Sequence, residues 1–87
     1  MNYGKAFREL REEKGLSRAE IANRIGCTPS ALSKIESGKV RPKEKTIEKF
    51  CVMTSTQIAR FYTLALTRED FSLISIQKKL LSSDVSK

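Results

Sequence analysis

The residues of this chain that could do chemistry are mostly cations, and they gather in one stretch. Residues 34–49 hold six basic side chains and three acidic ones, and the whole chain has 17 Lys and Arg against 10 Asp and Glu, a net charge of +7. Ammonium and guanidinium groups bind anions through charge-assisted hydrogen bonds. Such a stretch is compatible with nucleic acid, an acidic protein or an anionic membrane surface. The six cations are Lys34, Lys39, Arg41, Lys43, Lys45 and Lys49.

The chain has few residues suited to catalysis or metal binding. The 87 residues include no histidine, the commonest general base and metal ligand. The two cysteines, Cys27 and Cys51, cannot complete a four-ligand zinc site. Both are expected to be small core hydrophobes, as is usual in a reducing compartment. We therefore expect no enzymatic activity, no metal and no cofactor.

The length and hydropathy of the chain set further bounds. A chain of 87 residues makes one domain. No apolar run approaches the ~18 residues that span a membrane, and the N-terminus lacks the pattern of a signal peptide. The cations follow a turn rather than one face of an amphipathic helix, which disfavours a membrane-surface role. We expect a cytoplasmic protein.

Apolar spacing and capping residues predict a series of short helices. Ser17 and Glu20 form a capping box, and Thr28 with Pro29 begins another helix. Ser55 is the expected cap of a fifth helix. Residues 67–70 form another helix start signal, with Thr67 as the expected cap. The residues that follow, 71–81, suit a helix better than an edge strand. The first four predicted helices are 3–14, 18–25, 29–37 and 44–53. The fifth follows Ser55, with Ile58, Phe61, Tyr62, Ala65 and Leu66 along one side. Residues 82–87 are expected to fray.

Residues 18–35 carry the pattern of a helix-turn-helix. Ala22 stands where two helices cross and only a small side chain permits close approach. Gly26 stands four residues later, where the turn needs a positive φ. The expected buried positions around them are Ile21, Ile25, Cys27, Leu32 and Ile35.

The sequence at this point resembles the lambda-repressor-like (Xre-type, Cro/repressor) helix-turn-helix family. The resemblance is carried by residues 10–42, LREEKGLSRAEIANRIGCTPSALSKIESGKVRP, and extends more weakly over residues 1–53. It implies an all-α fold, a compact bundle of about five helices. It also implies sequence-specific binding of double-stranded DNA, usually by a homodimer that regulates transcription. The C-terminal element for dimerisation, a helix in preference to a strand, is inferred separately, from the apolar residues within 58–81.

The resemblance also implies roles for individual residues, with residues 29–37 as the recognition helix. Arg11 and Glu36 match a structural ion pair of the family. Without the surrounding motif, the polar residues of this helix would be read as a solvated face. The implied base contacts are Pro29, Ser30, Ser33 and Lys34, and the implied phosphate contacts are Arg18, Thr28, Lys39, Arg41, Lys43 and Lys45. Lys43 replaces the Ser or Thr that usually caps the next helix, so we expect that cap bond to be missing.

The C-terminal part is more apolar than one side of a small bundle requires. Eleven large apolar residues lie within residues 58–81. Leftover apolar surface usually marks a partner site, and a larger core of the single chain is the alternative explanation. We expect a DNA-binding domain at 1–66, a dimerisation extension at 67–81 and a frayed tail at 82–87. The predicted dimer interface is Phe61, Leu64, Phe71, Ile74 and Leu81.

Two functions from different classes fit these features. The first is a dimeric, sequence-specific transcriptional regulator, acting as a repressor on a two-fold symmetric operator. The alternative is an antitoxin whose C-terminal half binds a toxin while its helix-turn-helix represses its own operon. An enzyme is disfavoured because no nucleophile–base pair is present.

Overall fold

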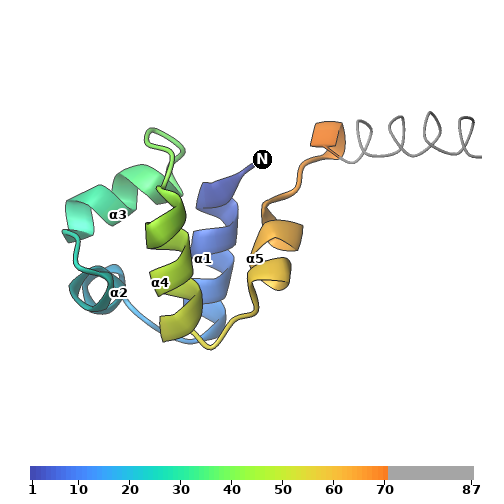
Figure 1. Cartoon of the computed structure of the whole chain (residues 1–87). Coiled ribbons are helices and arrows are strands. Elements are labelled where there is room, and N and C mark those ends of the chain that lie inside the picture. Colours follow the sequence, from blue (N-terminus) through green and yellow to red (C-terminus); the bar gives the residue numbers. More distant parts are fainter. Residues whose placement is uncertain (71–87) are drawn as a thin grey trace, which may run out of the picture.

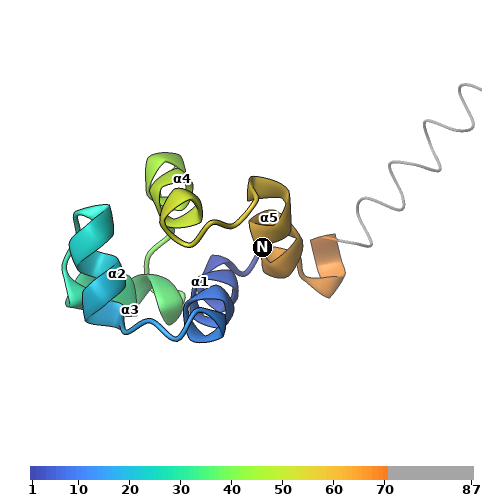
Figure 2. The ribbon, with the colours of Figure 1, turned by 90° about the horizontal axis from the view of Figure 1, so that it is seen from below.

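The structure is a computed structural model that describes residues 1–70, and helices are the only regular secondary structure in this part of the chain (Figure 1). Helices α2 and α3 lie on one side of α1 and α4, and α5 lies on the other (Figures 1 and 2). This confirms the all-α fold class, because the described residues contain no strand. None of their helices is long and apolar enough to cross a membrane. The helices are α1 (Tyr3–Glu13), α2 (Arg18–Ile25), α3 (Pro29–Glu36), α4 (Glu44–Met53) and α5 (Ile58–Ala65).

The ends of α2 and α3 follow from local side-chain chemistry. The Ser17 hydroxyl accepts from the Glu20 N–H, and the Glu20 carboxylate accepts from the Ser17 N–H, which closes the predicted capping box. Gly26 ends α2 at φ +78°, a backbone region that disfavours any side chain. Thr28 caps α3 by accepting from the Ala31 N–H at 3.0 Å. Helices α1 and α3 each end one residue before the predicted end.

Helix α5 begins differently from the prediction. Its N-cap is Gln57, with no side-chain cap bond, so the assignment of Ser55 as the cap was wrong. Ser55 instead closes the end of α4 at φ +53°. Its N–H donates to the Val52 carbonyl, and the Thr56 N–H donates to the Cys51 carbonyl. These two bonds make a Schellman turn, which needs a left-handed residue at the position of Ser55.

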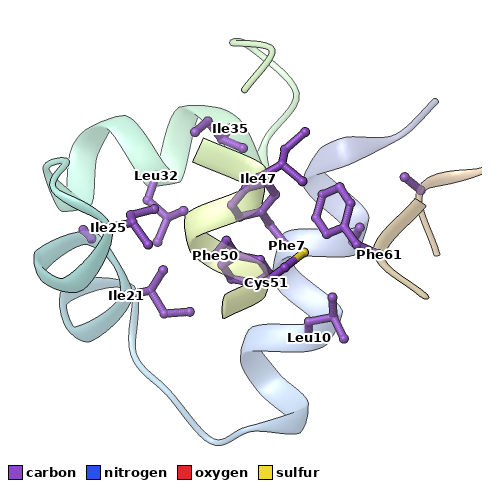
Figure 3. Packing of buried hydrophobic residues seen from close by; sticks show 13 residues of the cluster. Phe7, Leu10, Ile21, Ile25, Leu32, Ile35, Ile47, Phe50, Cys51 and Phe61 are labelled. Carbon is purple, nitrogen blue, oxygen red and sulfur yellow. The ribbon is translucent and has the colours of Figure 1, made fainter. Parts of the chain in front are cut away.

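The core is built around three phenylalanine rings (Figure 3). The Phe7 centroid lies 4.3 Å from that of Phe50 and 5.4 Å from that of Phe61, the latter pair edge to face. Phe61 is 0% exposed, so its assignment to the dimer interface was wrong. The Phe61 ring closes the core of the single chain. The number of apolar residues in 58–81 does not distinguish a core residue from one that contacts a second copy.

Close approach of α1 to the end of α3 depends on Gly4. A Cβ at this position would lie 2.5 Å from the Glu36 carbonyl oxygen and 2.6 Å from that of Ile35. Real Cβ atoms do not approach backbone oxygens so closely, so only glycine fits. This contact places the first turn of α1 directly against the last turn of α3.

The predicted start signal at Thr67 forms in the structure. The Asp70 carboxylate accepts from the Thr67 N–H at 2.9 Å, and the Thr67 hydroxyl accepts from the Asp70 N–H. The bond from the Thr67 N–H, together with the one that the Thr67 hydroxyl donates to the same carboxylate, lowers the pKa of Asp70. Leu64 is half-buried against the core. The other predicted interface residues, Phe71, Ile74 and Leu81, lie outside the described residues, as do the helix-or-strand question and the tail 82–87.

Candidate nucleic-acid interface

Helix α3 presents one apolar and one polar face. Leu32 and Ile35 are buried, whereas Ser30, Ser33 and Lys34 are exposed. The spacings of three and four residues put these three polar side chains on one side of the helix. Pro29 is exposed at the first position of the helix. All four residues expected to contact bases are therefore accessible to a partner.

The loop after α3 folds back onto the helix. The N–H groups of Lys39 and Val40 both donate to the Lys34 carbonyl, at 2.9 and 3.2 Å. The cations of the loop thus begin beside the last turn of α3. Lys39, Arg41 and Lys43 are all exposed, as is Lys45 in the first turn of α4. Lys43 is the N-cap of α4 and makes no side-chain cap bond, as its side-chain type indicated.

Arg41 is positioned by a contact that the sequence did not indicate. Its guanidinium donates to the Tyr3 hydroxyl at 3.2 Å and lies 5.3 Å from the centroid of the Tyr3 ring. A cation over an aromatic ring is attracted to its electron-rich face. The two residues are 38 positions apart, so no local pattern could have revealed the pair.

One carboxylate joins the first three helices. Glu36 is buried, and its side chain is 4% exposed. Its Oε2 accepts from Arg11 Nε at 2.9 Å, and its Oε1 accepts from Arg11 at 3.1 Å and from Arg18 Nε at 3.3 Å. Arg11 also donates to the Leu16 carbonyl. The Arg11–Glu36 pair expected from the family is present, and Arg18 is a second partner of Glu36 that was not predicted from the sequence.

The burial of Glu36 decides the charge of this side of the molecule. Residues 28–43, which we call the basic face, contain four cations and Glu36 as the one acid. Because the Glu36 carboxylate is paired and shielded, the exposed side chains of the basic face carry positive charge only. Hydroxyls, ammonium groups and a guanidinium together can bind phosphate oxygens and donate to base edges.

The two cysteines are poorly suited to nucleophilic chemistry. Burial raises the pKa of the Cys27 and Cys51 thiols, and a raised pKa disfavours the reactive thiolate. Within residues 1–70 no group of three or more His, Cys, Asp and Glu could hold a metal ion. The basic face is therefore the candidate site in the described part of the chain.

Comparison with known proteins agrees with this geometry. Residues 2–61 match the family described as "Helix-turn-helix domain". The chain is 35% identical over 60 residues to the HTH-type transcriptional regulator PuuR of Escherichia coli, covering 69% of the chain and 32% of PuuR. It is 30% identical over 82 residues to the cryptic phage CTXphi transcriptional repressor RstR of Vibrio cholerae, covering 94% of the chain and 74% of RstR.

A solved structure shares the same fold. The clp gene regulator ClgR from Corynebacterium glutamicum superposes with a TM-score of 0.70 at 25% identity, covering 74% of this chain and 83% of ClgR. The chain spans about a third of the length of PuuR, whereas it spans about three quarters of RstR. The family match over residues 2–61 includes the helices that build the basic face.

Proposed function

The chain belongs to the helix-turn-helix domain family, and from this premise we propose that it is a sequence-specific, duplex-DNA-binding transcriptional repressor that acts as a homodimer. The observation that carries the proposal is the basic face, on which every exposed charge is positive because Glu36 is buried between two arginines. The family's regulators include RstR, which is named as a transcriptional repressor and which this chain covers over 74% of its length.

Helix α3 is proposed to enter the major groove. Lys34 can donate to O6 and N7 of guanine, and Ser30 and Ser33 can donate or accept with little selectivity. Pro29 adds an apolar contact at the start of the helix. The exposed positions of all four side chains support this assignment, since the opposite side of α3 is buried in the core.

Phosphate contacts are proposed on both sides of α3. Lys39, Arg41, Lys43 and Lys45 follow the helix, and Arg18 begins α2. The Arg18 side chain is 50% exposed while its Nε is bound to Glu36, so the guanidinium is oriented and still accessible. Thr28 uses its hydroxyl oxygen to accept from the Ala31 N–H, which leaves the hydroxyl proton for a phosphate oxygen. Such contacts fix the register on the duplex without reading sequence.

A dimer gives the proposed regulator its operator geometry. Two copies related by a two-fold axis present two α3 helices about one DNA turn (~34 Å) apart. We propose residues 1–66 as the DNA-binding unit and residues 67–81 as the pairing extension. In this arrangement, repression results from occupation of DNA that polymerase requires.

The experiment is selection of bound sequences from a random duplex pool at physiological salt with the purified full chain. The expected result is a consensus with two-fold symmetry, whose half-sites are centred about 10 base pairs apart or a multiple of that. Recovery of a consensus without symmetry would remove the dimer from the proposal. Recovery of no consensus would remove sequence-specific binding.

A further inference from the structure

A second surface, between α4 and α5, is lined largely by apolar side chains. It is a groove of about 630 Å³ between α4 and the first turns of α5, which we call the α4–α5 groove. Its apolar lining comes from Ile47, Cys51, Val52, Ile58 and Tyr62. Val52 is 81% exposed and Ile58 is 43% exposed. These are two of the four large hydrophobic residues that are exposed among residues 1–70.

The exposure of Val52 and Ile58 has no explanation in the packing of the single chain. The three phenylalanine rings already fill the core, and both residues face outward from it. A scattered exposed valine is ordinary, but here two exposed side chains border one hollow with an apolar lining. Covering such a surface with an apolar segment is favourable, because it removes apolar side chains from water.

The edge of the groove indicates the charge of its occupant. Glu44 and Glu48 lie on α4 one turn apart, and both are exposed where they line the groove. An occupant that places cations beside these carboxylates is favoured over an acidic one.

This chain contains a segment with that chemistry. Residues 71–81 carry six large apolar side chains, two lysines and no acidic residue. The segment combines apolar residues for the lining of the groove with Lys78 and Lys79 for its two glutamates.

The described residues that precede this segment lie away from the groove of their own chain. Residues 68–70 stand on the side of α5 opposite α4 in both views (Figures 1 and 2). The Asp70 carboxylate is held there by the Met1 amino group at 3.1 Å, and the Asn2 N–H donates to the Ala65 carbonyl. Asp70 is thus held beside the N-terminus of α1, which favours a groove on another molecule over that of the same chain.

We infer that the α4–α5 groove receives residues 71–81 of a second copy of this chain, and that the exchange is reciprocal. The inference rests on the homodimer of the proposed function and names the two surfaces that form it. In the dimer each groove covers its Val52 and Ile58 with the partner's apolar side chains, and each pair of glutamates faces the partner's Lys78 and Lys79.

A charge exchange between two variants tests this inference. One full-length variant carries Glu44→Lys and Glu48→Lys, and the other carries Lys78→Glu and Lys79→Glu. Each homodimer then sets like charges against each other, so its dissociation constant in sedimentation equilibrium rises at least about tenfold at low ionic strength. An equimolar mixture restores a heterodimer near wild-type affinity, because both of its contacts are complementary. If mixing gives no heterodimer, the exchange between copies is contradicted.

A second pair of variants tests the apolar contact. Val52→Asp places a charge in the groove but disturbs no buried contact in the single chain, since Val52 is 81% exposed. Ala59→Asp is the matched control, because Ala59 is exposed on α5 and does not line the groove. Circular dichroism should show both variants folded, with dimer affinity lowered at least about tenfold by Val52→Asp alone.

The outcomes separate this inference from the proposed function. A wild-type protein that stays monomeric at all concentrations contradicts the dimer itself and the groove with it. A wild-type dimer that tolerates Val52→Asp and both charge variants contradicts the groove and leaves the dimer standing.

Discussion

Arg18 Nε lies 3.3 Å from Glu36 Oε1, so the carboxylate at the end of α3 holds a guanidinium from α2 as well as Arg11 from α1. The two helices of the helix-turn-helix are therefore joined by an ion pair in addition to the apolar contacts at Ala22 and Leu32. Glu36 also removes its own negative charge from the basic face by pairing. A single buried side chain thus sets both the position of α3 and the electrostatics beside it.

Glu36→Gln should lower the free energy of unfolding by about 2–4 kcal/mol, because it leaves two arginines facing a neutral amide in a partly buried site. Arg18→Gln should cost under about 1 kcal/mol, since half of the Arg18 side chain is exposed. Urea unfolding followed by circular dichroism measures both. Glu12→Gln is the matched control because Glu12 is 63% exposed and lies 4.0 Å from Arg11. Equal costs for the Glu36 and Glu12 variants would contradict a buried structural pair.

Gly4→Ala should destabilise the protein by about 1–3 kcal/mol, although alanine is ordinarily the better helix former. The new Cβ would fall 2.5 Å from the Glu36 carbonyl oxygen and would push α1 away from α3. Thermal unfolding compares this variant with Lys5→Ala, a change at the next, exposed position of the same helix. A higher melting temperature for Gly4→Ala would show that the two helices do not approach so closely.

Ser55→Gly should stabilise the protein by about 0.5–1 kcal/mol, because a left-handed conformation costs a serine more than a glycine. Ser55 has φ +53° in the Schellman turn that ends α4, and its side chain is exposed. The measurement is the urea midpoint, with Ser37→Gly as the control, since Ser37 has φ −85° at the corresponding end of α3. A loss of stability in the Ser55 variant would contradict the turn.

The helix-turn-helix was predictable because its signals are local. Ser17 with Glu20, Gly26, and Thr28 with Pro29 each fix a helix end through neighbours in the sequence, and all of these ends form where expected. The Arg11–Glu36 pair spans 25 residues, and only the family resemblance indicated it. The Tyr3–Arg41 and Arg18–Glu36 contacts carry no sequence signal, since they depend on how α1, α2 and the loop come together.

The two errors have the same physical origin. Phe61 and Ser55 both belong to patterns that admit two structures: an apolar residue can close a core or pair with a partner, and a serine can begin one helix or end another. In the folded chain Phe61 packs in the core, and Ser55 takes the left-handed conformation of the turn that ends α4.

Arg41→Ala should weaken binding to specific and non-specific duplexes by similar factors and reduce the slope of log affinity against log salt by about 0.9. The reason is that Arg41 is proposed to neutralise one phosphate without reading a base. Fluorescence anisotropy over a salt series measures the slope. Tyr3→Phe is the control for the local contact, because it removes the hydroxyl that accepts from Arg41 and keeps the ring. A loss confined to one DNA sequence would contradict the phosphate role.

The most direct measurement for the central claim, that α3 reads bases, is the ratio of specific to non-specific affinity for Lys34→Ala and for the wild type at one salt concentration. The DNA is the consensus duplex selected by the wild-type protein and a shuffled duplex of equal composition. We predict that Lys34→Ala costs about 1–3 kcal/mol on the consensus duplex and much less on the shuffled one, so that the ratio falls. An equal loss on both duplexes would contradict the assignment of α3 as the helix that reads DNA sequence.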